Sequence, residues 1–549
     1  MAIAVDKLLE AGVQCGLIDN RQLKELRLLA RKTQQPLLLL VQAHYRFPLS
    51  VLYHAVAEQA GLLFVDLSVC QVNEASLKKI PPSLVRRKQV LPVVFENSDY
   101  LAVADPFDRV AIDSVMRLTG GSVPLVLVDP VALNLKIRQL QSDPVGDDAA
   151  NVDAEQPDLI AILDAILREA YFSRASDIHL ITEKNGIRVR FRVDGRLRDH
   201  PVEADGETAA ALISRIKVLS ELDISEQRMP QDGGFSYHLA PPVDKTFNIR
   251  VATAPIRLGE RVTLRLLGQE ISRLSLKDLG MLADDLEHFK QAIEKPYGLI
   301  LLTGPTGSGK STTLSAALEE INHPDINIMT VENPIEYVIP GASQVQTGPK
   351  VTFASALRSF LRHDPDVLMV GEIRDFETAD VAVKAAMTGH MVFSTLHTNN
   401  AVSAITRLID IGCESFLIGS TITAVIAQRL VRRLCSHCRQ PYQASETEAV
   451  MLGQQEQRPE IYQASGCARC QGSGFSGRLG LFETLWFDDT LARAVMRGAD
   501  EEALEKQAGS RLRFMWEDGA RKVLQGLTTL DELNNVAVFK TRDMLEDTP

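Results

Sequence analysis

The nine residues GPTGSGKST, at positions 304–312, decide the fold of this 549-residue chain. They match the pattern G-x-x-x-x-G-K-[ST] and follow the apolar run LILLT at 299–303. Between a strand and a helix, such glycines let backbone N–H groups converge on phosphate. The lysine then reaches the β- and γ-phosphate oxygens, and the serine can ligate Mg²⁺. We therefore predict a nucleotide-binding loop made of Gly304, Pro305, Thr306, Gly307, Ser308, Gly309, Lys310, Ser311 and Thr312.

The segments around this loop predict a parallel α/β sheet. Short apolar runs recur at 298–303, 326–331, 367–370 and 391–394, and each is separated from the next by a long stretch of helical pattern. Strands alternating with helices in this way are typical of βαβ units.

Acidic and histidine residues follow these predicted strands. DPDVLMVGEIRD (364–375) places Glu372 directly after one, TVENPIE (330–336) contributes Glu332 and Glu336, and TGHMVFSTLHTNNA (388–401) contributes His390 and His397. A single carboxylate or imidazole at such a position is commonly structural. As a set at the carboxyl ends of parallel strands, where α/β ligands bind, they indicate residues that orient water or accept a proton.

These four segments resemble the Walker A, Asp box, Walker B and His box of the secretion ATPase superfamily. More narrowly, residues 158–540 are similar to type II secretion and type IV pilus assembly ATPases. The resemblance implies a RecA-like P-loop fold, ATP and Mg²⁺ as ligands, and a homo-hexameric cytoplasmic motor. It also implies that the motor docks on an inner-membrane platform protein and its cytoplasmic segment, peripheral to the inner membrane, and drives pseudopilus or pilus assembly. The choice between type II secretion and pilus extension stays open.

The resemblance also implies roles for individual residues. Glu332 and Glu372 divide the general-base and Mg²⁺ roles in an order that the sequence leaves open, and His397 belongs to the catalytic set. Two pairs of arginines are implied as well: Arg250 and Arg265 would reach the nucleotide cleft, and Arg358 and Arg362 would bind nucleotide near a subunit boundary.

Two positions depart from the family pattern, Asn333 and, more mildly, His363, which stands in place of the usual glutamine. Asn333 stands where the family usually has aspartate. Without the carboxylate charge of that aspartate, a second class of function stays open: a nucleotide-binding regulatory or scaffold subunit with little ATP turnover.

Four of the seven cysteines form two CxxC pairs, Cys435 with Cys438 and Cys467 with Cys470. Four thiolates at this spacing predict a structural Zn²⁺ site. Unligated thiols and a redox pair are the alternatives, and neither pair lies in the βαβ context of a redox motif.

Composition and segment patterns give the domain organisation. The acidic stretch 142–157 predicts a flexible linker between an amino-terminal docking region at 1–141, made of one or two small domains that mix helices and strands, and an α+β middle domain at 158–272. The ATPase domain follows at 273–549 and includes a zinc subdomain at about 432–475.

A net charge of −12 disfavours nucleic acid as a partner, and no insertion signal is evident, so we expect a cytoplasmic protein.

Some relatives bind cyclic di-GMP through amino-terminal motifs that begin Arg-Leu-Gly. Here PLLLL occupies 36–40, where such a motif would start, so we do not expect the chain to sense this ligand.

Overall fold

The computed structural model describes residues 3–119, 123–141, 158–184, 186–202, 204–267, 274–454 and 456–540. Two compact units form: residues 1–269 with 465–474, and residues 270–464 with 475–549. The predicted linker at 142–157 lies outside the described residues. Within the described ranges, no helix has both the length and the apolarity that a membrane span requires.

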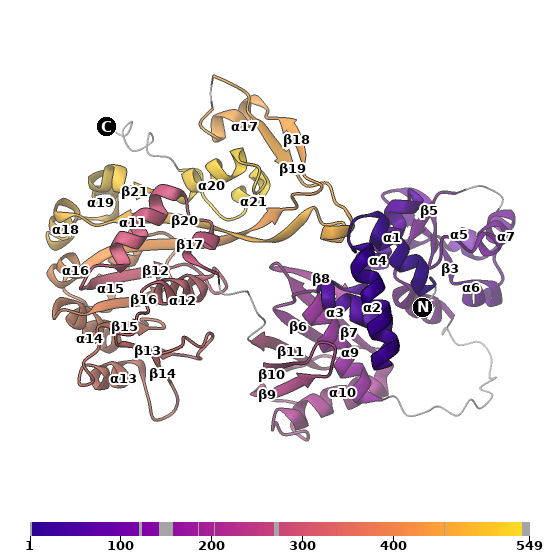
Figure 1. Ribbon diagram of the computed structural model, residues 1–549, viewed down its shortest axis with the longest axis horizontal. Coiled ribbons are helices and arrows are strands. Elements are labelled where there is room, and N and C mark those ends of the chain that lie inside the picture. The colour runs from indigo at the N-terminus through magenta and orange to yellow at the C-terminus, as the bar shows by residue number, and fades with distance from the viewer. Residues whose placement is uncertain are drawn as a thin grey trace. The chain divides into compact units, whose positions relative to one another are not determined.

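The first unit begins with four helices and a small mixed sheet (Figure 1). The sheet has the strand order β1-β5-β4-β3-β2. Leu127 is fully buried and belongs to the core of the four helices, so the sheet and the helices pack together. The helices are α1 (Val5–Gln14), α2 (Asn20–Thr33), α3 (Leu37–Tyr45), α4 (Leu49–Ala60), α5 (Glu74–Leu77), α6 (Pro82–Lys88), α7 (Arg109–Thr119) and α8 (Pro130–Gln141). The strands are β1 (Leu63–Phe64), β2 (Gln71–Val72), β3 (Val90–Phe95), β4 (Ser98–Val103) and β5 (Leu125–Leu127).

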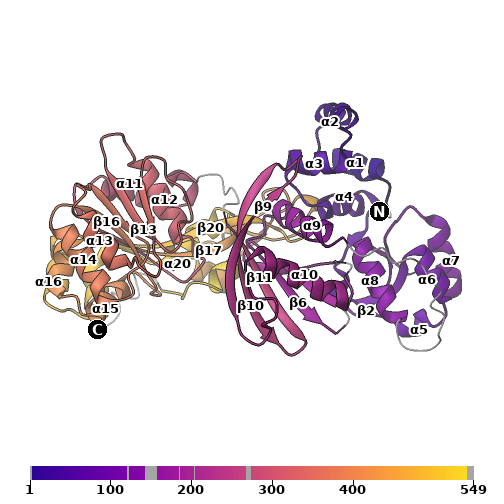
Figure 2. The same ribbon diagram turned by 90° about the horizontal axis from the view of Figure 1, so that it is seen from below.

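The same unit contains a six-stranded antiparallel sheet of order β8-β7-β6-β11-β10-β9, whose long strands β9, β10 and β11 are strongly twisted in Figure 2. The helix before it starts where predicted, because the Asp158 carboxylate accepts hydrogen bonds from the N–H groups of Ile160 and Ala161. The elements are α9 (Leu159–Phe172), β6 (Asp177–Glu183), β7 (Gly186–Val193), β8 (Arg196–His200), α10 (Gly206–Leu219), β9 (Gln231–Leu239), β10 (Lys245–Ile256) and β11 (Gly259–Leu267).

The second unit is built on an eight-stranded sheet of order β14-β13-β15-β16-β12-β17-β20-β21. The strands from β14 to β17 run parallel, which confirms the predicted α/β class. The strands of this parallel part are β12 (Gly298–Thr303), β13 (Ile328–Glu332), β14 (Ser343–Gln346), β15 (Val367–Val370), β16 (Met391–Leu396) and β17 (Ile422–Leu434). The helices are α11 (Ala283–Ile293), α12 (Lys310–Glu320), α13 (Phe353–Phe360), α14 (Phe376–Met387), α15 (Val402–Ile411) and α16 (Ser415–Thr421).

The position of β12 in the sheet explains why residues 299–302 are all apolar. Leu299 and Leu301 belong to the core on one face of the sheet, whereas Ile300 and Leu302 belong to the core on the other face. All four side chains are fully buried. A strand covered by helices on both faces needs a continuous apolar run, so the sequence shows no alternation here.

Two antiparallel strands extend the sheet beyond β17: β20 (Phe475–Trp486) and β21 (Leu512–Arg513). The chain between β17 and β20 contains α17 (Glu446–Met451) and a two-stranded sheet of β18 (Gln440–Gln443) and β19 (Glu460–Gln463). The unit ends with α18 (Asp489–Met496), α19 (Glu501–Ala508), α20 (Met515–Leu524) and α21 (Leu530–Asn534).

Candidate functional site

The predicted phosphate loop joins β12 to α12 at the carboxyl edge of the parallel sheet. Gly304, Gly307 and Gly309 all have positive φ, at 142°, 79° and 92°. A Cβ atom on Gly304 would lie 2.4 Å from the carbonyl oxygen of Gln428, so only glycine fits there. Gly309 is the N-cap of α12, which directs the first N–H groups of that helix into the loop.

Lys310 lies inside this loop rather than in solvent. Its ammonium donates to the carbonyl oxygens of Gly304 at 2.7 Å and Pro305 at 3.0 Å, and the residue is only 8% exposed. Burial lowers the pKa of Lys310 to about 8, a shift that the nearby Glu372 carboxylate partly opposes. The lysine is therefore a desolvated cation beside the loop backbone, as a phosphate ligand requires.

Glu372 follows β15 and lies beside His397, which follows the neighbouring strand β16. Its Oε2 atom is 3.3 Å from Nε2 of His397 and 2.8 Å from Nε of Arg374. The carboxylate side chain is 13% exposed, whereas that of the histidine is 45% exposed. This mostly buried carboxylate lies close enough to Lys310 to favour the charged lysine.

Glu332 ends β13, the strand on the other side of β15. Its Oε1 atom accepts from Thr330 Oγ1 at 2.7 Å and from Gln344 Nε2 at 2.9 Å. Glu332 is thus fixed in orientation at the same edge of the sheet as Glu372, while the next residue, Asn333, is exposed.

The prediction that His390 lies at a carboxyl strand end is wrong. His390 precedes β16, and its Nδ1 atom is 3.0 Å from the carbonyl oxygen of Ala385 at the end of α14. The left-handed Gly389 (φ 107°) turns the chain there, so His390 lies at the amino edge of the sheet. His397, after the same strand, lies at the carboxyl edge.

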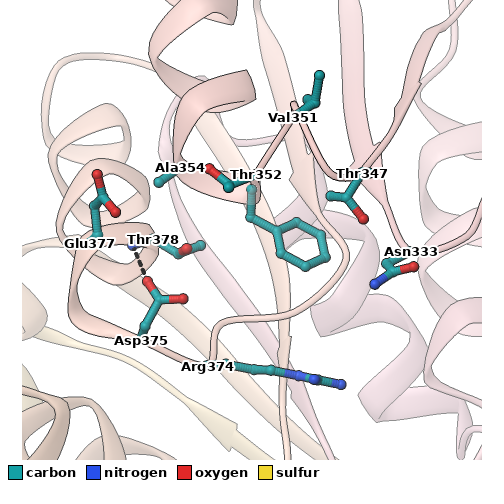
Figure 3. A pocket seen from close by; sticks show the side chains of 11 residues that line it. Asn333, Thr347, Val351, Thr352, Ala354, Arg374, Asp375, Glu377 and Thr378 are labelled. Carbon is teal, nitrogen blue, oxygen red and sulfur yellow. Dashed lines mark hydrogen bonds between the residues drawn. The ribbon is translucent and has the colours of Figure 1, made fainter.

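A depression of about 430 Å³ opens beside the site, and its lining includes Asn333, Phe353, Arg374 and Glu377 (Figure 3). The side chain of Arg374 extends along it toward Asn333. Arg358, from α13, donates to Glu377 Oε1 at 2.7 Å across an exposed ion pair.

The remaining predicted arginines occupy different settings. Arg362 is exposed and donates to the carbonyl oxygen of Arg358 at 3.0 Å. Arg250 and Arg265 are register partners on β10 and β11 of the first unit. Arg265 donates to the buried Asp177 at 2.8 Å, whereas Arg250 is exposed. The nucleotide roles of these arginines stay predictions.

The four cysteines of the CxxC pairs converge after β17 and before β20, where Leu434 and Phe475 are paired. Their four sulfur atoms all lie within 4.8 Å of one another. The Sγ atoms of Cys467 and Cys470 are 3.8 Å apart, which is the spacing of two thiolates on one tetrahedral ion with bonds of about 2.3 Å. Backbone N–H groups of Cys467 and Gly474 point at Cys470 Sγ, each at 3.2 Å. Such donors stabilise a thiolate, so the donor set fits Zn²⁺.

Comparison with known proteins agrees with this geometry over most of the chain. Residues 152–535 match the family described as Type II/IV secretion system protein. The chain belongs to the Type II/IV secretion system protein family. Residues 60–147 of this family member match the MshEN domain.

Relatives of this secretion system protein are similar over long stretches. The Type II secretion system protein E of Pseudomonas aeruginosa is 43% identical over 486 residues, covering 84% of this chain and 96% of its own. The Type II secretion system ATPase E of Vibrio cholerae is 46% identical over 396 residues, covering 72% and 78%. The Type IV pilus assembly ATPase PilB of Myxococcus xanthus is 37% identical over 511 residues, covering 87% and 89%.

A solved structure supports the fold of the family member. The ATPase DotB of Legionella pneumophila has a TM-score of 0.51 at 24% identity, covering 71% of this chain and 99% of its own. The predicted RecA-like architecture is thereby confirmed.

Three residues of the site were missed by the sequence reasoning. Arg374 follows Glu372 by two positions and could have been found from that spacing. Gln344 holds Glu332 from the neighbouring strand β14. Gln428 holds Thr313 Oγ1 at 2.8 Å from β17, more than a hundred positions away. Only the strand order reveals the last two contacts.

Proposed function

We propose that this chain hydrolyses ATP at the carboxyl edge of the second unit's sheet. The observation that carries the proposal is the buried Lys310 ammonium in a glycine-shaped loop, with the Glu372 carboxylate near it and His397 at 3.3 Å from that carboxylate. A cationic phosphate ligand and an oriented carboxylate are two of the groups that catalyse phosphoryl transfer to water.

Each residue then has a definable task. The loop N–H groups and Lys310 bind the β- and γ-phosphates and stabilise charge that develops on them. Glu372, held by Arg374 and His397, keeps its carboxylate aimed at the attacking water and accepts the proton. Ser311 and Glu332 would hold Mg²⁺, which would neutralise charge on the phosphates. Arg250, Arg265, Arg358 and Arg362 supply further positive charge, at least one of them from a neighbouring subunit.

The proposed setting is a homo-hexamer at the cytoplasmic face of the inner membrane that powers pseudopilus or pilus assembly. The family and the long matches to type II secretion and pilus assembly ATPases support this setting. The amino-terminal region at 1–141 docks on the platform protein's cytoplasmic segment, and 142–157 is its linker. The middle domain at 158–272 and the ATPase domain at 273–549 follow, and a Zn²⁺ ion on the four cysteines stabilises the subdomain at about 432–475.

The alternative function, a scaffold subunit with little ATP turnover, was suggested by Asn333 in place of the family's aspartate. That side chain is exposed, and Glu332 takes its hydrogen bonds from Thr330 and Gln344 instead. The missing charge at 333 therefore removes no contact that orients Glu332, and the enzyme is the better supported of the two functions.

The test compares ATP turnover of the purified chain with that of Lys310→Ala. We expect the variant to lose turnover, because Lys310 is the one cationic residue among the nine residues of the loop, 304–312. Lys295→Ala, at an exposed position before β12, is the matched control and should behave as wild type. Near-native turnover in Lys310→Ala would contradict the proposal. Separate assays of exoprotein release and of pilus formation in a strain that lacks the chain would distinguish the two machineries.

A further inference from the structure

The end of β17 forms one wall of the phosphate loop. The last register pair between β12 and β17 joins Thr303 to Ala427, so residues 428–430 run beside the loop. A Cβ atom on Gly309 would lie 2.7 Å from Nε2 of Gln428 and 3.5 Å from Cδ2 of Leu430. Arg429 stands between these two contact residues in β17, and because strand side chains alternate, its own side chain leaves the opposite face of the strand, where it contacts Asn399. Neither the motifs nor the family resemblance assigned it a role.

Arg429 is half-buried, and its guanidinium is incompletely paired. Nη2 donates to the Asn399 side-chain oxygen at 3.2 Å. Nη1 is buried and has no hydrogen-bond partner within the described ranges. An unsatisfied buried N–H group of a charged side chain costs free energy, and an oxyanion is the partner that this fork fits best.

The electrostatic setting supplies a second reason to expect an anion. Burial lowers the pKa of Arg429, a shift that the nearby Glu483 carboxylate partly opposes. The charges of Arg429 and Lys310 repel each other, so an anion placed near both is stabilised, in addition to the carboxylates of Glu483 near Arg429 and Glu372 near Lys310. Phosphate oxygens bound by the loop are such charge.

The bond to Asn399 connects Arg429 with the segment that holds His397. Thr398, which lies between His397 and Asn399 in the chain, exchanges hydrogen bonds with Thr303, the last residue of β12. The two hydroxyls are 2.7 Å apart, and the Thr398 N–H group donates to Thr303 Oγ1 at 2.8 Å. The segment is thus tied to the phosphate loop's own strand on one side and to Arg429 on the other. Its position fixes the imidazole that contacts Glu372.

We propose that Arg429 is a second phosphate-binding cation of the nucleotide site, acting within its own subunit, and that it positions the His397 segment through Asn399. Its planar fork allows Nη1 to bind a phosphate oxygen while Nη2 keeps Asn399. The inference rests on the proposed ATPase function and adds to it a residue that links occupancy of the site to the geometry around Glu372.

The test measures three quantities on the full chain carrying Arg429→Gln: the Kd of ADP and of a non-hydrolysable ATP analogue, kcat, and the melting temperature without nucleotide. We expect the Kd values to rise by about tenfold or more, the effect of losing one charged hydrogen bond. Without nucleotide, the melting temperature should be equal or higher, because the variant removes a partly unpaired buried charge. A merely structural arginine predicts the opposite sign, a lower melting temperature with unchanged Kd, and that result would overturn the inference.

Two further variants separate the parts of the proposal. Asn399→Ala should keep the Kd and lower kcat, because the phosphate contact stays and the His397 segment loosens. Arg429→Lys keeps the charge but lacks the fork, so it should bind nucleotide better than Arg429→Gln while sharing the kcat defect of Asn399→Ala. Arg497→Gln, an exposed position just after α18, is the control.

Failure of this inference differs from failure of the proposed function. Wild-type Kd and kcat in Arg429→Gln, with Lys310→Ala inactive, would reject the role of Arg429 and leave the ATPase assignment intact. Turnover that survives in Lys310→Ala would reject the assignment itself.

Discussion

Oε2 of Glu372 and Nε2 of His397 lie 3.3 Å apart, although the two residues are 25 positions apart in the chain. They come together because β15 and β16 are parallel neighbours that end at the same edge, with Val370 paired to Ser394. The imidazole and the Arg374 guanidinium both contact the same carboxylate oxygen.

The substitution Glu372→Gln should preserve nucleotide binding and reduce turnover by about 100-fold or more, as expected when a positioned base is lost. The amide keeps the shape of the side chain but cannot accept the proton. Titration calorimetry gives the Kd, and phosphate release gives kcat. Glu320→Gln, at the far end of α12 in an ion pair with Lys290, is the control. Equal loss of binding and turnover would mean that Glu372 mainly supports the fold or the metal.

Nucleotide affinity should depend on the protonation of Lys310. The pKa of this lysine in the free protein is about 8, and bound phosphates favour the ammonium, so binding raises it. The affinity should be constant below about pH 7 and fall above about pH 8 by up to tenfold per pH unit, because binding then takes up a proton. The Kd of ADP measured across this range tests the prediction. Lys310→Arg, which stays charged, should show no such fall, and a flat profile in the wild type would contradict the assignment.

The four clustered cysteines should bind one zinc ion per chain, as measured by elemental analysis of protein purified without added metal. Cys470→Ser should lose the metal and lower the melting temperature, since metal-binding free energy is also folding free energy. Cys15→Ser changes a cysteine outside the cluster and should keep full zinc content. Metal-free wild-type protein with unchanged stability would disprove the site.

Arg265 should act on the nucleotide of a neighbouring subunit. An Arg265→Ala chain mixed with a Lys310→Ala chain should then regain partial ATPase activity, because some interfaces combine an intact lysine with an intact arginine. Asp177→Asn removes the ion pair of Arg265 and is the control for a merely structural role. If mixed oligomers form without activity, or if Asp177→Asn matches the defect of Arg265→Ala, the arginine acts within its own fold.

The sequence predicted the strands whose residues are buried on both faces. The runs at 298–303 and 367–370 coincide with β12 and β15, because a continuous apolar stretch between helices has few other interpretations. It was harder to predict at which edge of the parallel sheet each histidine lies. His390 was predicted at the carboxyl edge but lies at the amino edge, because the turn at Gly389 falls directly before it. A motif shows which residues are neighbours in the sequence, whereas the strand order determines which residues are neighbours in the folded chain.

For that reason Arg429 and Gln428 were beyond prediction from the sequence alone. They depend on β17 lying beside β12, more than a hundred residues away. The antiparallel pairing of β20 with β17 was also unforeseen, because the whole cysteine-containing segment separates them. Glu372, by contrast, was found from its strand and its distance to the phosphate loop.

Strands β12 and β16 are parallel and paired at six consecutive positions, from Gly298 with Met391 to Thr303 with Leu396. Sliding one strand along the other would strain all the hydrogen bonds between them at once, so the two strands resist relative sliding. A displacement that begins where phosphate binds should therefore move β12 and β16 together, because the hydrogen bonds between them resist sliding. We therefore expect the centre of the sheet to move as one rigid unit.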